Sequence, residues 1–208
     1  MKKNILFLIL SVFCAKIMFS EGTENIKNFV RGNLSEKTAA VKAATKDEVE
    51  ELSKRAIDFA VENKEILGED RELAALAVSG ILAVPQNFAD EFSEAEKTKL
   101  ADEFLNLYNI FDDETVKIAV LTKISKLDIS TEKFKENLND YLANCNPETE
   151  NRAILSASIQ TIGNIGDSDS FKILMNNAQK AEEGTAPKGP AALFDLRDNL
   201  QLLPAHRN

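Results

Sequence analysis

The side chains that could do chemistry are few, and two acidic clusters come first among them. Residues 112–114 (Asp-Asp-Glu) and 167–169 (Asp-Ser-Asp) carry enough carboxylates to hold a hard cation. The second cluster begins like a calcium-binding loop, but Lys172 and Ala178 stand where such a loop has glycine and glutamate. Acids also cap helices and favour their N-termini. We therefore expect both clusters to begin helices, and we predict no metal site.

Nucleophilic catalysis would need a nucleophile paired with a base, and the chain offers little for either role. His206 is the sole histidine, within the segment 204–208 (PAHRN), which is a poor setting for a general base or a ligand. Cys145 follows a run of helically spaced apolar residues, so a buried small hydrophobe is the favoured interpretation. A reactive or intermolecular thiol is the alternative. We predict no catalytic residue, no cofactor and no enzymatic activity.

One short run is more apolar than a single helix face requires. It contains six large apolar residues in eight positions, namely Phe104, Leu105, Leu107, Tyr108, Ile110 and Phe111. An amphipathic helix turns only about half of its residues toward a core. Core packing between neighbouring helices is the favoured explanation. The alternative is an exposed patch for a protein partner, made by Phe104, Leu107, Tyr108 and Phe111.

The chain opens with the features of a secretory signal peptide. Two lysines follow Met1, and an apolar run then covers residues 5–13, which is shorter than the roughly 20 residues that span a bilayer. We predict a signal peptide over residues 1–20, with cleavage after Ser20 and Gly22 as the alternative site. This predicts export to the periplasm or cell envelope, without membrane insertion after the signal is removed.

Cys14 raises a second possibility for the same segment, because bacterial lipoprotein signals place a lipidated cysteine after the apolar run. Phe13 stands where such signals have a small residue, so this remains the alternative. Cleavage after Ser20 would remove three lysines and change the net charge from −9 to −12. Nucleic acid and anionic lipid are poor partners for an acidic chain, so we expect a protein or peptide partner.

Apolar residues recur at helical spacing through most of the chain, and no segment is typical of a strand. Capping residues, glycines and prolines mark the ends of the predicted helices. The predicted helices cover residues 23–44 with a break at 32–33, 45–67, 70–84, 93–108, 112 or 113–127, 130–145, 146–162 and 168–181. A loop follows at residues 182–190 (EEGTAPKGP), and a last helix covers residues 191–203.

Three of these helices repeat one apolar pattern at intervals of 43 and 38 residues. Each uses positions i, i+3, i+4, i+8 and i+11. The sets are Leu73, Leu76, Ala77, Ile81 and Val84; Val116, Ala119, Val120, Ile124 and Leu127; and Ile154, Ala157, Ser158, Ile162 and Ile165. Intervals near 40 residues are typical of helical-pair repeats.

The third unit carries further residues of a known repeat. Arg152 lies early in its first helix, Ala157 and Ser158 lie midway, and residues 162–167 (IGNIGD) precede the second helix. Over residues 151–175 the chain resembles the HEAT-like repeat family, in its PBS-lyase-type variant. Over residues 70–145 only the pattern and period match. The resemblance implies structural roles: Gly163 and Gly166 would shape the turn, Asp167 would cap the next helix, and Phe171 and Leu174 would face inward.

Together the repeat and the resemblance predict an all-α, right-handed α-solenoid of HEAT-like helix pairs, with about four repeats. Residues 21–208 would form a single domain, with the helix at 191–203 capping its end. The implied function is that of an exported, non-enzymatic protein-binding or scaffolding protein of the bacterial cell envelope. The alternatives are an envelope-anchored lipoprotein with a structural role and an accessory subunit of an envelope enzyme.

Overall fold

The computed structural model describes residues 23–87, 92–146 and 150–182. Several predictions therefore lie outside the described residues. These are the signal peptide with its cleavage site after Ser20, the lipidation of Cys14, the segment around His206, the loop beyond Glu182 and the helix at 191–203.

Every regular element of the described chain is an α-helix, which confirms the all-α prediction. The helices are α2 (Glu24–Arg31), α3 (Leu34–Lys42), α4 (Val49–Leu67), α5 (Arg71–Ala83), α7 (Glu94–Ile110), α8 (Glu114–Leu127), α9 (Glu132–Asn144), α10 (Arg152–Ile165) and α11 (Ser168–Glu182). Within the described ranges, none of them is both long and apolar enough to cross a bilayer.

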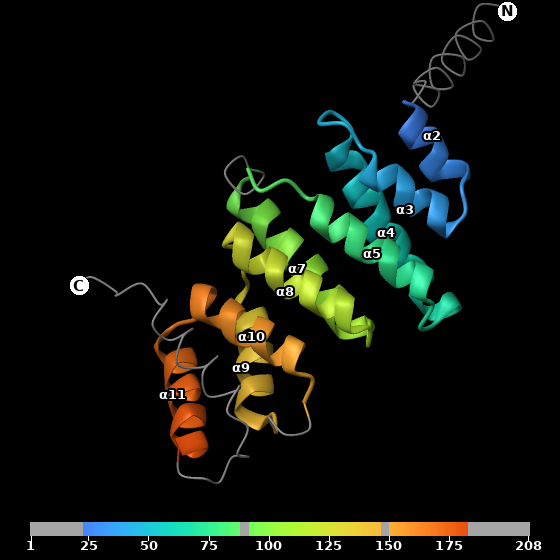
Figure 1. Ribbon diagram of the computed structural model, residues 1–208. Helices are drawn as coiled ribbons and strands as arrows, with labels where there is room; N and C mark the ends of the chain where they lie inside the picture. The colour runs from blue at the N-terminus through green and yellow to red at the C-terminus, as the bar shows by residue number, and fades with distance from the viewer. Residues whose placement is uncertain (1–22, 88–91, 147–149, 183–208) are drawn as a thin grey trace, which may run out of the picture.

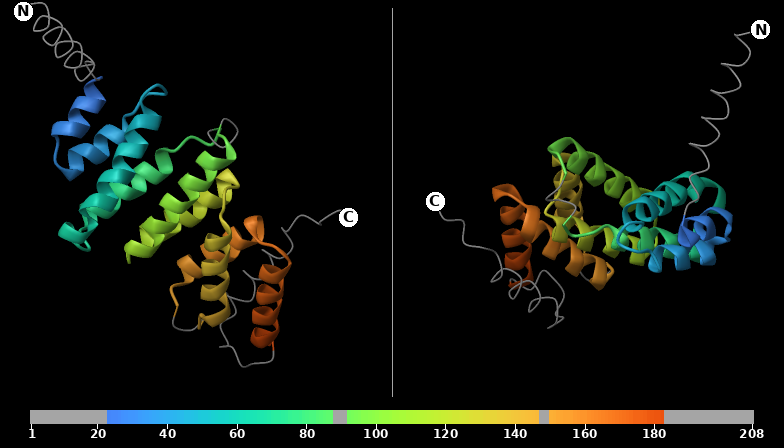
Figure 2. Two further views of the ribbon diagram at one scale, coloured as in Figure 1. Left: turned by 180° about the vertical axis from the view of Figure 1, so that it is seen from behind. Right: turned by 90° about the horizontal axis from the view of Figure 1, so that it is seen from above.

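The helices pack mainly against their neighbours in the sequence and against the helix two places away. Helices α5, α8 and α10 lie side by side and form what we call the central row (Figures 1 and 2). Each has a partner from the preceding segment, so that α4 packs on α5, α7 on α8, and α9 on α10. Helices α2 and α3 cover one end of this arrangement, and α11 covers the other through contacts with α9 and α10.

The repeated apolar positions do line the core of the central row. All ten predicted positions in α5 with its cap Val84 and in α8 are buried. In α10 only Ser158 and Ile162 are buried; the other three positions are partly exposed, and Leu155 and Ile159 are buried in addition. The repeated positions are least completely buried in α10, which lies toward the end of the arrangement that α11 covers.

Polar side chains connect neighbouring helices of the central row at nearly the repeat interval. The Thr161 hydroxyl of α10 donates to the Leu121 carbonyl of α8 at 3.0 Å, across 40 residues of sequence. The Lys123 ammonium of α8 donates to the Leu82 carbonyl of α5 at 3.1 Å, across 41 residues. Equivalent points along successive helices are therefore fixed to each other by hydrogen bonds as well as by apolar contacts.

Among the described residues three lysines are buried, and each donates to a carbonyl at or just past a helix end. Lys37 reaches the last-turn carbonyls of α2, Lys64 reaches Gly68 at the end of α4, and Lys123 reaches α5. Their exposed fractions are only 7%, 9% and 5%. Burial lowers the pKa of both Lys37 and Lys123. Because the last carbonyls of a helix have no intrahelical partner, these ammonium groups satisfy acceptors that would otherwise be buried unpaired.

Two predicted helix starts are wrong. The helix predicted from residue 45, where Thr45 and Glu48 have the spacing of a capping box, begins only at Val49, and residues 46–48 form a turn. The carboxylate of Glu48 is instead used by Thr45 and by Asn25 of α2. The helix predicted from Asn146 begins at Arg152, because the Asn151 side chain accepts from the next turn and acts as the cap.

The turn after α10 also differs from the expected one. Gly163 lies inside α10, so only Gly166 shapes the turn. Its backbone is extended with φ −73°, and a glycine is needed there because a Cβ would come within 2.3 Å of the Ile162 carbonyl oxygen. Phe171, predicted to face inward, is 47% exposed, whereas Ser170 and Leu174 are buried. The hydrogen bond from the Ser170 hydroxyl to the capping Asp167 helps hold α11 in this rotation.

Helices α4 and α5 cross closely at Gly80. A Cβ on Gly80 would lie 2.9 Å from the Ala56 Cβ and 3.1 Å from the Ser53 carbonyl oxygen. Both contacts come from α4, and Ala56 and Ser53 are themselves buried. The small residues at this crossing therefore set how closely the two helices approach.

Candidate functional site

The four residues of the predicted apolar patch do not form an exposed surface. Phe104 and Leu107 are fully buried, and Phe111 is 1% exposed. Tyr108 is partly exposed, with its ring edge-on to Phe134 at 6.4 Å between centroids. Helix α7 packs against α8, and to a lesser extent against α4 and α9, so more than one of its sides contacts a neighbouring helix. Core packing, the favoured explanation of this run, is what the structure shows.

Each carboxylate of the first acidic cluster has its own partners. Asp113 caps α8 by accepting from the Thr115 and Val116 backbone N–H groups at 2.8 and 3.2 Å. Asp112 pairs with Lys117 at 3.6 Å. Glu114 accepts from the Asn151 side chain at 2.6 Å and so joins α8 to the start of α10. The three carboxylates stabilise helices and do not converge on one point.

The second acidic cluster is also a helix start. Asp167 accepts from the backbone N–H groups of Asp169 and Ser170 at 3.0 and 3.1 Å. The hydrogen bond from the Ser170 backbone N–H contributes most to lowering the pKa of Asp167. Asp167 also pairs with Lys135 of α9 at 3.8 Å. Across the described ranges, no group of three or more His, Cys, Asp and Glu side chains is placed to hold a metal ion.

The two tyrosines of the chain meet where α7, α9 and the start of α10 come together. The Tyr141 hydroxyl donates to Glu150 at 3.3 Å. Burial is the main cause that raises the pKa of both Tyr108 and Tyr141. Cys145 lies beside them at the end of α9 and is half-buried, less than predicted. Phenols with raised pKa values stay protonated, so this cluster is a poor source of a general base.

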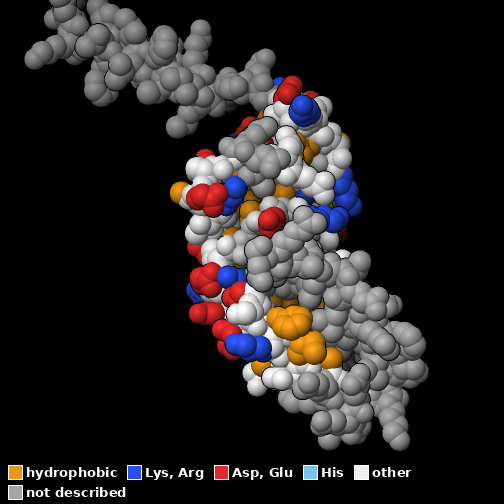
Figure 3. Space-filling view, turned by 90° about the vertical axis from the view of Figure 1, so that its left-hand side faces the viewer, with side chains coloured by type: hydrophobic (Ala, Val, Ile, Leu, Met, Phe, Trp, Pro, Cys, Tyr) orange, Lys and Arg blue, Asp and Glu red, His pale blue; other side chains and the backbone are white. Residues whose placement is uncertain are grey.

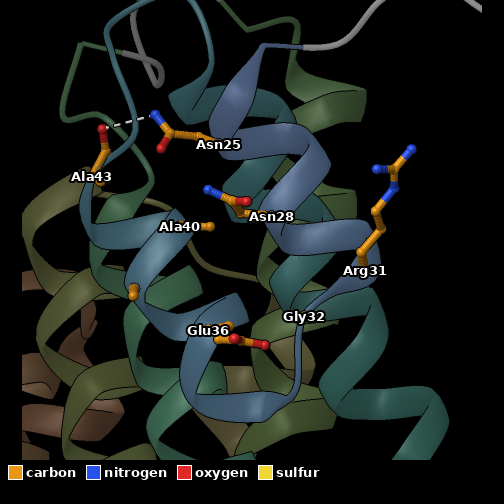
Figure 4. Close-up of a pocket in the computed structure, with 8 residues that line it drawn as sticks. Asn25, Asn28, Arg31, Gly32, Glu36, Ala40 and Ala43 are labelled. Atoms are coloured by element: carbon orange, nitrogen blue, oxygen red, sulfur yellow. Dashed lines mark hydrogen bonds between the residues drawn. The ribbon is translucent and has the colours of Figure 1, made fainter.

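The structure has an open groove at its N-terminal end, between α2 and α3, which sequence analysis missed. Its volume is about 480 Å³. The lining side chains are polar along α2 and small along α3, with Asn25, Asn28, Arg31 and Gly32 on one side and Glu36, Ala39, Ala40 and Ala43 on the other. Figure 4 shows Asn25 and Asn28 pointing toward α3, while the Arg31 side chain extends away from it. We call this the α2–α3 groove.

Several hydrogen-bonding groups in the α2–α3 groove are open to a ligand. Asn28 is exposed, and its amide makes no hydrogen bond within the described part of the chain. Both bonds recorded for Asn25 use its amide nitrogen, which leaves its carbonyl oxygen as an acceptor. Glu36 gives one carboxylate oxygen to the Asn33 N–H as part of the cap of α3. The groove thus combines donors and acceptors above a floor of alanines, as a polypeptide backbone would require.

No protein-family model, no curated protein and no solved structure matches this chain.

A buried carboxylate holds one end of the α2–α3 groove in place. Glu48 is 3% exposed and accepts from the Thr45 N–H, the Thr45 hydroxyl and the Asn25 amide at 2.8 to 2.9 Å. Asn25 in turn donates to the Ala43 carbonyl at 3.1 Å (Figure 4). Hydrogen bonds from Thr23, Thr45 and Asn25 lower the pKa of Glu48 to about 2, and the bond from the Thr23 side chain contributes most. This network ties α2 to the end of α3 and to the turn before α4.

We expect the Glu48 network to make stability depend on pH in the acid range. The folded-state pKa is lowered from 4.5 to about 2, so the charged form stabilises the fold above pH 4.5. That stabilisation is lost as the pH falls from 4.5 to about 2. Glu48→Gln should melt below the native protein at pH 7, and the two melting curves should converge near pH 2. Thermal denaturation followed by circular dichroism measures this difference.

The matched control is Glu36→Gln, which changes an exposed carboxylate in the capping box at the start of α3. It should show a smaller change in melting temperature at pH 7. A Glu48→Gln protein that melts like the native one at pH 7 would contradict the role assigned to this carboxylate.

Proposed function

We propose that this chain is a non-enzymatic binding or scaffolding protein of the HEAT-like helical-repeat type, exported to the periplasm or cell envelope. The single observation that carries this proposal is the central row. Its helices repeat one apolar pattern, and hydrogen bonds join them across 40 and 41 residues. A chain built from such repeats is a quasi-linear stack whose exposed grooves are suited to binding an extended partner.

The α2–α3 groove is the best-supported binding surface for this function. It is a concave site near one end of the arrangement, and its open polar groups match the backbone of a peptide. The small side chains of Ala39, Ala40 and Ala43 allow a partner segment to approach the α3 backbone closely. The overall charge of −9 favours association with neutral or basic partners. The partner we propose is therefore a neutral or basic segment of another envelope protein.

A photo-cross-linking residue placed at Asn28 tests this assignment in cells. Because Asn28 is exposed and points into the groove, it should yield one reproducible protein adduct. Adding Ala43→Trp, which fills the groove from the exposed side of α3, should abolish that adduct by blocking the site. The control position is Ile66, 80% exposed at the far end of α4, where the same adduct should not form.

The same preparation tests export, because the mature N-terminus can be read by mass spectrometry. A chain beginning at Glu21 or Thr23 in the envelope fraction would support signal cleavage, whereas a lipidated Cys14 would make the protein membrane-anchored. A protein that keeps Met1 and stays in the cytoplasm would overturn the proposed location. An adduct that survives Ala43→Trp would overturn the proposed groove.

A further inference from the structure

The two ends of α2 are attached to the rest of the molecule in different ways. The C-terminal end is joined to α3 through Gly32 and Asn33, so the chain itself fixes it. The N-terminal end is attached through a side chain, because the Asn25 amide donates to the Ala43 carbonyl at 3.1 Å and to Glu48 at 2.9 Å. We call the first the hinge end of α2 and the second its bridged end.

Buried contacts add to the covalent link at the hinge end. Phe29 is the one buried side chain of α2, with 4% of it exposed. The Lys37 ammonium of α3 donates to the carbonyls of Phe29 and Val30. It also lies 5.1 Å from the centroid of the Phe29 ring and 5.0 Å from that of Phe59. Because such contacts are strongest where water is excluded, the hinge end is firmly held.

The bridged end contributes no buried side chain. Ile26 is only partly buried, and the Thr23 side chain adds one hydrogen bond to Glu48. The bond from Asn25 to the Ala43 carbonyl is exposed to solvent. Such a bond adds little net stability, because water can replace it. The bridged end is therefore held mainly by hydrogen bonds and is the end of α2 that can separate from α3.

The bond at the bridged end also crosses the α2–α3 groove. The groove extends along the helix pair from Asn25 and Ala43 to Gly32 and Glu36. Figure 4 shows the bond from Asn25 to the Ala43 carbonyl joining the two walls, and the Gly32 link joins them at the other end. An extended segment that lies along the groove therefore meets a closure at each end. Only the closure at the bridged end can open without breaking the chain.

The groove differs in character from the exposed apolar surface of the molecule. Hydrophobic side chains gather on the lower part of the surface in Figure 3, whereas α2 and α3 lie in the upper part of the molecule (Figure 1). The groove instead offers polar groups for hydrogen bonds. When the bridged end opens, the Asn25 amide and the Ala43 carbonyl lose each other as partners. The backbone of an occupant can replace both lost interactions, because it carries a donor and an acceptor at each residue.

We propose that α2 is a hinged wall of the α2–α3 groove, which turns about its hinge end and releases its bridged end when a partner segment enters. This inference rests on the proposed function, since it concerns the same groove and the same kind of partner. The Asn25 amide and the Ala43 carbonyl exchange their mutual bond for bonds to the segment. Phe29 and Lys37 stay in place. Adjacent extended backbones lie about 5 Å apart, so the bridged end moves by a distance of that order.

Distances between spin labels on the full chain measure this movement without a partner. Cys14 and Cys145 are first replaced by alanine, so that labels attach only to introduced cysteines. The bridged-end pair is Glu24→Cys with Lys99→Cys, and the hinge-end pair is Arg31→Cys with Lys99→Cys. All three label positions are exposed, and the shared reference position lies on α7, outside the groove.

Asn25→Asp should release the bridged end while keeping the size of the side chain. A carboxylate cannot donate to the Ala43 carbonyl, and it repels Glu48. The substitution should roughly double the width of the distance distribution of the bridged-end pair, because the released end samples several positions. The hinge-end pair should keep its native distribution. Asn28→Asp is the matched control, because Asn28 makes no hydrogen bond within the described ranges, and it should change neither pair.

Ala39→Trp tests the effect of filling the groove. Ala39 is exposed and lines the groove from α3, so the indole acts as a fixed occupant. It should shift the mean distance of the bridged-end pair by about 5 Å and leave the hinge-end pair unchanged. Circular dichroism establishes that each variant keeps its helices.

The hinged wall would be contradicted by any of three results. Broadening of both pairs in Asn25→Asp would mean that α2 detaches as a whole. An unchanged bridged-end pair in that variant would mean that the bridge does not hold α2. A native distance in Ala39→Trp would separate groove filling from release. If these distances behave as expected but the Asn28 adduct does not form, the proposed partner fails and the movement stands. An adduct with an unmoved bridged end would count against the hinged wall alone.

Discussion

Phe104→Ala is expected to lower the free energy of unfolding by about 3–5 kcal/mol, the usual cost of removing a buried phenylalanine. Phe104 is fully buried and belongs to the main core cluster formed by helices from α4 to α11. Its loss would leave a cavity where α7 meets its neighbours, and a well-packed interior closes such a space only in part. Urea denaturation followed by circular dichroism measures the change.

Ile66→Ala is the matched control, since it also shortens a large apolar side chain but at a site that is 80% exposed. It should change the free energy of unfolding by less than about 0.5 kcal/mol. If Phe104→Ala were as stable as the control, the side chain would not be a core residue, and its earlier interpretation as part of a partner-binding patch would return.

Gly80→Leu is the second substitution with a large expected effect, about 3 kcal/mol of lost stability. The added Cβ alone would lie 2.9 Å from the Ala56 Cβ and 3.1 Å from the Ser53 carbonyl oxygen. Neither atom belongs to a flexible side chain, so α4 and α5 would have to separate to admit the leucine. The resulting gap would also loosen contacts of buried Ile57. Thermal and urea denaturation measure the loss.

Gly80→Ala serves as the internal comparison for this crossing. Alanine improves helix propensity by up to about 1 kcal/mol, which partly offsets the tight contact that its Cβ makes with Ala56. We therefore expect a small loss for alanine and a large one for leucine. If both variants were as stable as the native protein, the crossing would not depend on the absence of a side chain at position 80.

Helix existence was largely predictable from sequence because it depends on local signals. A capping box of Ser93 and Glu96 begins α7 within a residue of the predicted start, and Gly68, at the positive φ of 63°, ends α4 at the predicted place. The start of α4 was not predictable from the same rule. Glu48 has the spacing of a capping box with Thr45, yet Asn25, twenty-three residues away, also uses its carboxylate. The Thr45 N–H still donates to Glu48, but Asn25 shares that carboxylate and α4 begins four residues after Thr45.

The candidate sites were less predictable, because exposure depends on neighbours that a single sequence does not place. The apolar run in α7 was compatible with either core or surface, and contacts with α4, α8 and α9 decided it. The α2–α3 groove left no motif to find, since it consists of two asparagines, a glutamate and several alanines brought together by the bend at Gly32. A Cβ at Gly32 would lie 2.6 Å from the Asn28 carbonyl oxygen, and only in the structure does this close approach become visible.

The buried lysines have a consequence for the chemical reactivity of the folded protein. Acylating reagents attack the neutral amine, and they must reach it from solvent. Lys37, Lys64 and Lys123 are shielded and bonded to carbonyls, whereas Lys99 and Lys172 have side chains that are 70% exposed. A brief acylation would therefore mark the exposed amines and leave these three unmodified in every intact molecule. Acylation at Lys37, Lys64 or Lys123 would therefore distinguish unfolded copies of the chain from folded ones.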